Sequence, residues 1–594
     1  MPDLSNLYSL RISKFRRKER ALLKKIRIIS FFRLLDFLAI CFAFAFSFSD
    51  GIWYALAGLF LIAIFIYCVR QYTHLSQSLA ATRILIKHNE NEIKSSKGED
   101  DSFDYSPGVD FSSHLYATDL DIFGSFSLFR KINRTTTLDG KIKLVDSLLN
   151  PTTDNQTIRQ RRELISELSD AIDFRQNFYA FGLASGEKPN DIPKLEHWIA
   201  LPQFFRKKWY WVAISGLLTL MTLAAFVYVA FNGFAYIMYV ILVFIFNTCF
   251  HQVFFRSKIN QYLSRFGDYS QLFSTWSQLS SLIISKKLET PIGVGISNAI
   301  TGGDQALKDI ANLNKLIGYR LNGLTIFIMN GVCVFDIWFV LQIENWRKKN
   351  RKYLSSWIDC IVQVDYYNSL ANYKFNHPTF CVAELLDGSN KINAKGMGHP
   401  LISSDQMVRN DLVIGSTTKA HIITGSNMSG KSTFLRTIGT NVILALNGLP
   451  VCAESFSCSN LSIASCIRIS DSLGENQSYF KAEISRLSQI MELIRQGRPY
   501  LILLDEILRG TNSIDKREGT RAFYRKLSSF NCLAMLATHD PEIGLLEEET
   551  PDDFQNFHFE SYVVDSDITF DYLIRPGISN TKNASLLMRK LDLI

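Results

Sequence analysis

Four long apolar segments, grouped as two pairs, restrict most strongly what this chain can fold into. In the second pair, residues 209–231 and 234–255 contain no Asp, Glu, Lys or Arg, and only Asn232 and Gly233 separate them. Each segment has about the 20 residues that a helix needs to cross a bilayer. Two such neighbours are difficult to bury in a soluble core, which is the alternative interpretation. The sequence therefore predicts a transmembrane helical hairpin within residues 206–256.

The first pair follows a basic N-terminal tail, and together they form a predicted unit of residues 1–87. Residues 31–48 and 52–69 are apolar and are separated by a short Ser-Asp-Gly turn, although Arg33 and Asp36 weaken the first as a span. A cleaved signal peptide is disfavoured, because the basic region is long and no small-residue cleavage site precedes the second apolar run. The tail is the positive flank expected on the cytoplasmic side of a hairpin. Its basic residues are Arg11, Lys14, Arg16, Arg17, Lys18, Arg20, Lys24, Lys25 and Arg27.

A fifth apolar stretch, residues 324–343, is predicted to be a helix of a soluble core. It contains Asn330 and Asp336 and leads into a strongly basic segment. A fifth span would place everything after it on the opposite side of the membrane from the N-terminus. With four spans, the N-terminus, the helical core and the C-terminal third all face the cytoplasm. The predicted location is therefore a membrane that the chain crosses several times.

The other segments before residue 398 are predicted to be a linker and a helical core. Residues 88–111 are polar and contain Ser-Pro-Gly, which is typical of a linker. Residues 112–205 and 257–397 show apolar residues at helical spacing. The ten cysteines include no C-x-x-C pair, which disfavours a zinc site and indicates reduced thiols. The formal net charge of +8 is modest and does not by itself indicate a nucleic-acid partner.

The C-terminal third, residues 398–594, contains a glycine-rich loop with a definite chemistry. A short predicted strand at 421–424 runs into Gly-Ser-Asn-Met-Ser-Gly-Lys-Ser, which fits the G-x-x-x-x-G-K-[ST] pattern of a phosphate-binding loop. In such a loop Lys431 reaches the β- and γ-phosphates of ATP, and Ser432 binds Mg²⁺. The predicted ATP-binding residues are Gly425, Ser426, Asn427, Met428, Ser429, Gly430, Lys431, Ser432 and Thr433.

Two further predicted strands end in side chains that suit phosphoryl transfer. The apolar run at 499–504 ends in Asp505 and Glu506. Asp505 suits the Mg²⁺ shell, and Glu506 suits a general base that orients the attacking water. The run at 533–538 ends in His539, which would lie near the γ-phosphate and is predicted to be catalytic with Glu506 and Lys431. A strand-ending histidine with only a structural role is the alternative.

Four ordered motifs resemble the ATPase domain of the DNA mismatch repair MutS family. They are GSNMSGKSTFLRTIG, DSLGENQSYFKAEISRL, LLDEILRGTNSIDKREG and LATHD. The similarity extends from about residue 398 to about residue 546, and residues 119–151 resemble the start of the family's core helical domain. The resemblance implies a multidomain protein in which an α-helical core, here with two transmembrane hairpins, precedes an α/β P-loop NTPase domain of the MutS/ABC-like type. It also implies ATP and Mg²⁺ as cofactors.

The resemblance further implies a homodimer, because two ATPase domains of that family face each other and each completes the partner's site. Ser478 would then act in trans at the γ-phosphate. From the residues alone, Ser478 is equally well an N-cap of the predicted helix that follows it. Asp515 is similarly placed, and a solvated loop carboxylate is its alternative interpretation.

The departures from the family restrict the predicted function. The family's mismatch reader is an N-terminal domain with an aromatic wedge followed by x-Glu, and no such domain is visible in this chain. The two hairpins stand where DNA-reading parts are expected. We therefore predict a membrane-anchored MutS-like ATPase with a composite dimer site and membrane lipid as a partner, and DNA binding stays open. The alternative is an ATP-driven mechanical, transport or scaffold protein without DNA binding.

Overall fold

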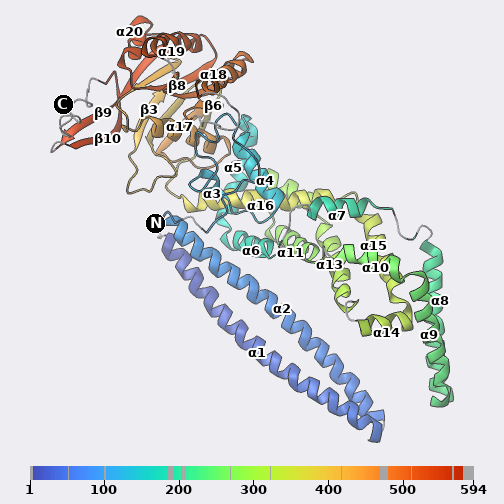
Figure 1. Cartoon of the computed structure of the whole chain (residues 1–594). Helices are drawn as coiled ribbons and strands as arrows, with labels where there is room; N and C mark the ends of the chain where they lie inside the picture. Colours follow the sequence, from blue (N-terminus) through green and yellow to red (C-terminus); the bar gives the residue numbers. More distant parts are fainter. Residues whose placement is uncertain are drawn as a thin grey trace.

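The chain divides into a long helical region and a C-terminal region built on two sheets (Figure 1). The computed structural model describes residues 4–50, 52–99, 102–184, 186, 191–202, 205, 208–267, 269–320, 323–388, 390–415, 418–468, 479–509, 512–564 and 567–579. The predicted order, helices first and an α/β region last, is confirmed. Two antiparallel pairs of helices project from the same side of the helical body, away from the sheets (Figure 1).

The N-terminal pair forms a stalk of two very long helices, α1 (Leu4–Asp50) and α2 (Ile52–Ser96). Apolar residues such as Phe15 and Leu85 are buried at the base of the stalk. Large apolar side chains are exposed toward its tip, including Phe42 and Trp53. The base therefore packs on protein, and the tip has the surface expected of a segment in lipid.

The polar segment from His88 was predicted to be a linker, and this prediction is wrong for its first part. Helix α2 continues to Ser96, and His88, Asn89 and Glu92 are buried. The polar residues are buried because they bond to the helical core. A linker begins only after α2 ends.

A buried charged cluster joins the stalk to the core, and we call it the stalk joint. The Glu92 carboxylate accepts hydrogen bonds from Arg134 Nε at 2.6 Å, Asn372 Nδ2 at 3.0 Å and Asn376 Nδ2 at 2.8 Å. The side chains of Glu92 and Arg134 are 0% and 3% exposed. Burial alone would raise the pKa of Glu92, but the nearby Arg134 guanidinium holds that pKa at about 2.

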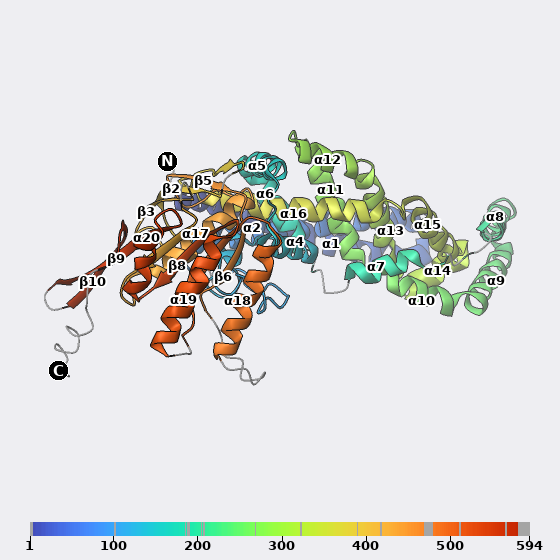
Figure 2. The same ribbon diagram turned by 90° about the horizontal axis from the view of Figure 1, so that it is seen from above.

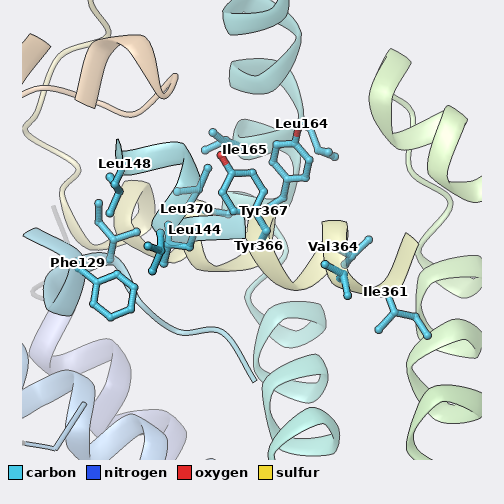
Figure 3. Packing of buried hydrophobic residues seen from close by; sticks show 14 of the residues in the cluster. Phe129, Leu144, Leu148, Leu164, Ile165, Ile361, Val364, Tyr366, Tyr367 and Leu370 are labelled. Atoms are coloured by element: carbon cyan, nitrogen blue, oxygen red, sulfur yellow. The ribbon is translucent and has the colours of Figure 1, made fainter. Parts of the chain in front are cut away.

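The helical core packs around α16 (Leu354–Asn376), which is buried over most of its length. Leu144, Ile165 and Tyr367 belong to the cluster of buried side chains where α4, α5 and α16 meet (Figure 3). Seen from above, α16 runs from the sheets to the far helices (Figure 2). The other core helices are α3 (Leu128–Ile132), α4 (Leu138–Leu149), α5 (Asn155–Asp170), α6 (Ile172–Leu183), α7 (Asp191–Ala200), α10 (Arg256–Gly267), α11 (Ser270–Lys286), α12 (Pro291–Ile300) and α13 (Gly303–Arg320).

The second hairpin consists of α8 (Lys208–Asn232), the short η1 (Phe234–Tyr236) and α9 (Ile237–Phe254). Among the described residues, three helices are long and apolar enough to cross a membrane: 57–96, 209–232 and 237–254. The apolar end of α1 is not one of them, and several of its side chains lie outside the described part. The membrane hairpins themselves stay predictions.

The stretch 324–343 was predicted to be one helix of a soluble core, and the structure shows two helices in place of one. It forms α14 (Gly323–Cys333) and α15 (Phe335–Asn350), which are bent by 88° at the break between them. Val334 lies at the break with φ +46°. Most of α15 is buried, whereas Leu324 and Phe327 of α14 are exposed. The polar residues Asn330 and Asp336 flank the break and bond to each other.

The C-terminal region contains a four-stranded and a six-stranded sheet, with orders β1-β5-β2-β3 and β10-β9-β4-β8-β7-β6. In the larger sheet all neighbours are parallel except β9 and β10. The strands are β1 (Glu384–Leu386), β2 (Ile392–Met397), β3 (Asn410–Ile414), β4 (Ala420–Thr424), β5 (Ser455–Ser459), β6 (Ser462–Cys466), β7 (Tyr500–Asp505), β8 (Cys532–Thr538), β9 (Phe554–Val564) and β10 (Asp567–Pro576).

The helices of this region are α17 (Lys431–Leu446), α18 (Tyr479–Arg495), α19 (Ser513–Ser528), η2 (Pro541–Leu545) and α20 (Leu546–Glu549). The predicted boundary at residue 398 is too late. Strands β1 and β2 lie before it, yet β2 pairs with both β3 and β5. The C-terminal region therefore includes residues from Glu384 onward.

Candidate functional site

The glycine-rich loop lies where the sequence predicted it, between strand β4 and helix α17. Strand β4 is buried at every residue and is flanked by β8 and β9, both parallel to it. Gly425 and Gly430 have φ values of +152° and +101°, which favour glycine. Residues 427–433 line a cavity of about 710 Å³. This volume is in the range of small-molecule sites.

Lys431 is held by the loop itself. Its Nζ donates to the carbonyl oxygens of Gly425 at 2.8 Å and Ser426 at 2.9 Å. The residue is 5% exposed, and burial lowers the pKa of its ammonium, although Glu506 and Asp505 oppose this. Two carbonyl groups thus hold the Lys431 ammonium at the cavity wall. An anionic ligand that binds it more strongly could replace them.

Ser432 and Asp505 come from different elements and meet at the cavity. Ser432 is the second residue of α17, and its hydroxyl donates to Asp505 Oδ2 at the end of β7. Burial raises the pKa of Asp505, while the Ser432 hydroxyl and Arg509 lower it. A hydroxyl and a carboxylate at one point form an oxygen donor pair of the kind that Mg²⁺ prefers.

Glu506 and His539 face each other across neighbouring strand ends. The Nδ1 atom of His539 lies 3.0 Å from Glu506 Oε1. This hydrogen bond is the main reason that the pKa of Glu506 falls to about 2. Glu506 also has φ +47°, and strained conformations of this kind concentrate at functional sites. The arrangement keeps Glu506 ionised and orients it through His539.

Arg509 adds a positive charge that the sequence analysis did not assign. Its guanidinium lies 3.5 Å from Glu506 Oε2 and 3.9 Å from Asp505 Oδ2, and it lines the same cavity. The sequence could have indicated this role of Arg509, because the residue lies only three positions after Glu506, in the segment that follows strand β7.

Tyr572 is a second lining residue that the sequence analysis missed. A register shift between Phe570 and Ile574 places it at φ +57°. Asn410 fixes this irregularity, because its Nδ2 donates to Tyr572 O at 3.0 Å and its Oδ1 accepts from Ile574 N at 2.8 Å. A Cβ at Gly430 would lie 3.0 Å from the Tyr572 ring. Only tertiary pairing brings Tyr572 to the loop, so no local pattern could reveal it.

The structure does not bring all predicted residues to this cavity. Ser478 lies outside the described residues, so its role stays a prediction. Asp515 is exposed in the first turn of α19 and is not among the residues that line the cavity. It accepts a hydrogen bond from Asn512 Nδ2 at 2.7 Å. In the part of the chain that is described, no group of three or more His, Cys, Asp or Glu could hold a metal ion.

The site belongs to an α/β domain in which a glycine-rich loop and two strand-end carboxylates converge on one cavity, and His539 contacts Glu506 without itself lining that cavity. Residues 421–589 match the family model for MutS domain V. The chain is 29% identical over 194 residues to the DNA mismatch repair protein MutS 2 of Halobacterium salinarum, and 30% identical over 207 residues to the endonuclease MutS2 of Lactococcus lactis. It is 28% identical over 211 residues to the DNA mismatch repair protein MutS of Thermotoga maritima.

These matches show that the C-terminal part of the chain is similar, at low identity, to proteins of the MutS family. They cover 32%, 33% and 34% of this chain. They cover only 22%, 25% and 26% of the three relatives. The chain thus spans about a quarter of the length of these relatives, and the family match over residues 421–589 includes the glycine-rich loop and both strand-end carboxylates.

Proposed function

We propose that this protein is a membrane-anchored MutS-like ATPase that binds ATP with Mg²⁺ and hydrolyses it. The observation that carries the proposal is the convergence of Lys431, Ser432, Asp505 and Glu506 on one cavity of about 710 Å³, with His539 in contact with Glu506. Phosphoryl transfer needs positioned charge more than covalent chemistry, and these groups supply it. The family match to residues 421–589 supports the same activity.

Each residue has a role that follows from its contacts. Mg²⁺, held by Ser432 and Asp505, would supply positive charge beside the phosphates. Lys431 would exchange the two loop carbonyls for phosphate oxygens. Glu506 would accept a hydrogen bond from the attacking water, and His539 would hold the carboxylate in place at 3.0 Å.

Dimerisation on ATP is part of the proposal. The resemblance to the MutS family supports two facing copies, with Ser478 completing the partner's site. Hydrolysis would remove contacts that only the closed dimer makes, and the helical core would then reopen. The cycle would act on the two hairpins, whose exposed apolar surfaces support a place in the bilayer.

Lys431→Ala is expected to abolish ATP binding in the micromolar range and, with it, turnover, because the loop loses its only charge for the phosphates. Lys419→Ala is the matched control, since Lys419 precedes the same strand at its opposite end and is exposed. Binding is measured with a fluorescent ATP analogue on full-length protein in detergent. Equal binding by wild-type protein and Lys431→Ala would contradict the assignment of the loop.

DNA binding is a second candidate function, and the names of the relatives favour it. We infer it only for the family-like region, because the chain spans so little of those proteins. Binding to matched and mismatched duplexes across a salt series, with and without ATP, tests it. Mismatch-selective binding that ATP changes would establish a DNA role, and the absence of binding at physiological salt would leave an ATP-driven membrane mechanical, transport or scaffold protein.

A further inference from the structure

Helix α14 packs against the middle of the apolar helix α9. The rings of Phe327 and Phe244 are 5.3 Å apart, and the Phe244 ring leaves no room for a Cβ at Gly331. Phe244 is the eighth of the 18 residues of α9. At 1.5 Å per residue, α9 is about 27 Å long and Phe244 lies about 10 Å from its start. If α9 spans a hydrocarbon core of about 30 Å, α14 lies at membrane depth.

The bend between α14 and α15 returns the chain to the side from which it came. Helix α13 before the pair and α16 after it both belong to the helical core, and the two helices of the pair meet at 88°. The pair is therefore an elbow that enters and leaves on one side, and we call it the α14–α15 elbow. It adds no fifth span, so the C-terminal region keeps its predicted side.

A buried pair of ionisable side chains connects this elbow to α9. His251 Nε2 lies 2.9 Å from Asp336 Oδ2, and the two side chains are 7% and 0% exposed. Asn330 brackets the same carboxylate from the other side of the break: its Nδ2 donates to Asp336 Oδ2 at 3.3 Å, and its Oδ1 accepts from Asp336 N at 3.0 Å. The break thus places a carboxylate opposite an imidazole, within about 5 Å of the end of α9 along its axis.

The cluster also contains a polar atom that no protein group satisfies. Asn247 is fully buried, and its Nδ2 donates to Thr222 Oγ1 at 3.0 Å and to Gly331 O at 2.9 Å. Its Oδ1 has no hydrogen-bond partner. A buried amide oxygen without a donor is costly, and one turn of helix separates it from His251. This oxygen could accept a hydrogen bond from a water or hydronium that approaches the pair.

Ionisable side chains within membrane-spanning segments are costly, and they mark ion and proton sites when they are retained. A leucine and an alanine in place of His251 and Asp336 would pack in the hairpin without this cost. Irregular backbone at such depth occurs where it is buried in protein or lines a functional site. The cluster has both features, a buried ionisable pair and a helix break at Val334.

We propose that the α14–α15 elbow is a re-entrant membrane element whose His251–Asp336 pair binds a proton and thereby makes ATP turnover depend on pH. The proposal rests on the proposed function, because it needs α9 in a bilayer and an active ATPase. Protonation turns a neutral imidazole beside a carboxylate into an ion pair. The contact between α9 and α15 becomes stronger, and the elbow becomes stiffer.

The other charged groups near the pair are few among the described residues. Helices α8 and α14 contribute Thr219, Thr222 and Asn330 to this region and no charged residue. Helix α15 carries Glu344 two turns after Asp336, and Glu344 accepts from Phe205 N at 3.4 Å. Helix α10 begins with Arg256, which donates to Gln252 at 3.0 Å and is exposed. Of the groups named here, His251 is the ionisable one that contacts Asp336.

A continuous path links the elbow to the ATPase region. Helix α15 is followed after three residues by α16, and α16 leads to strand β1. The stalk joint fixes the far end of α16 through Asn372 and Asn376. A stiffer elbow restrains the movement of α16 that turnover requires, so turnover is expected to fall on the acidic side.

The test is the pH profile of ATP turnover by the full-length protein in liposomes. Wild-type protein is expected to show an inflection between roughly pH 5 and 8 that His251→Gln and Asp336→Asn both lose. His197→Gln, which removes an exposed histidine on α7, is expected to keep it. His251→Gln retains a hydrogen-bonding side chain, so it reports on the proton even if Asp336→Asn does not fold.

The outcomes separate this proposal from the proposed function. A protein that fails to enter liposomes or to hydrolyse ATP contradicts the proposed function. A protein that does both, with the same pH inflection in wild type and His251→Gln, contradicts the proton site. ATP turnover that depends on the sodium concentration and not on pH would also contradict the proton site. It would indicate a cation site instead.

Discussion

Glu506→Gln is expected to lower ATP turnover by at least about 100-fold, the usual contribution of a general base. The amide keeps the size of the side chain and a contact with His539, but it carries no negative charge to orient the attacking water. ATP and Mg²⁺ would still bind, because Lys431, Ser432 and Asp505 are unchanged. The variant should therefore accumulate as an ATP-bound dimer, which size-exclusion chromatography with light scattering would detect.

Glu518→Gln is the matched control for this experiment. Glu518 is exposed on α19, outside the residues that line the cavity, and its variant should turn over ATP at the wild-type rate. Unchanged turnover in Glu506→Gln would contradict the role of Glu506. Loss of ATP binding in that variant would instead indicate that Glu506 holds the nucleotide.

Glu92→Gln is expected to lower the free energy of unfolding by about 3–5 kcal/mol, the cost of removing one partner of a buried ion pair. Arg134 would keep its charge in a site where it is 3% exposed, and it would lose the Glu92 carboxylate that accepts hydrogen bonds from its Nε and Nη2. Denaturant unfolding in detergent, followed by circular dichroism, measures the change. The stalk should detach from the core before the core unfolds.

The same pair predicts how stability depends on pH. The pKa of Glu92 is lowered from 4.5 to about 2 in the folded protein. The stability from its ionised form is fully present above pH 4.5 and is lost as pH falls through about 2. Glu19→Gln, which removes an exposed pair with Arg83 at 2.8 Å, should cost less than about 1 kcal/mol. Equal losses in the two variants would mean that the stalk joint contributes no more than a surface pair.

The predicted site residues that the structure brings to one cavity are those set by local pattern, and their roles stay predictions. A glycine-rich loop after a buried strand, and carboxylates at the end of another, follow from spacing alone. Lys431, Ser432, Asp505 and Glu506 are therefore found where they were expected. His539 also meets Glu506, because neighbouring parallel strands end at the same edge.

The parts that the sequence could not predict depend on tertiary contacts. The sequence alone assigns Glu92 to a linker. In the structure Arg134 and Asn372, which are distant from it in the sequence, donate hydrogen bonds to its carboxylate. In the sequence alone, Asp336 indicates a soluble core. The structure places His251 of the apolar helix α9 opposite it. Tyr572 reaches the cavity only through an irregularity in β10 that Asn410 holds.

Membrane attachment of the intact protein tests the central claim most directly. Full-length protein reconstituted into liposomes is floated on a density gradient before and after washing with alkaline carbonate, which removes peripheral proteins. Insertion of the hairpins predicts that the protein stays in the floating fraction after the wash and still hydrolyses ATP. Release into the soluble fraction would show that the apolar helices are buried against protein, and it would contradict a membrane-anchored ATPase.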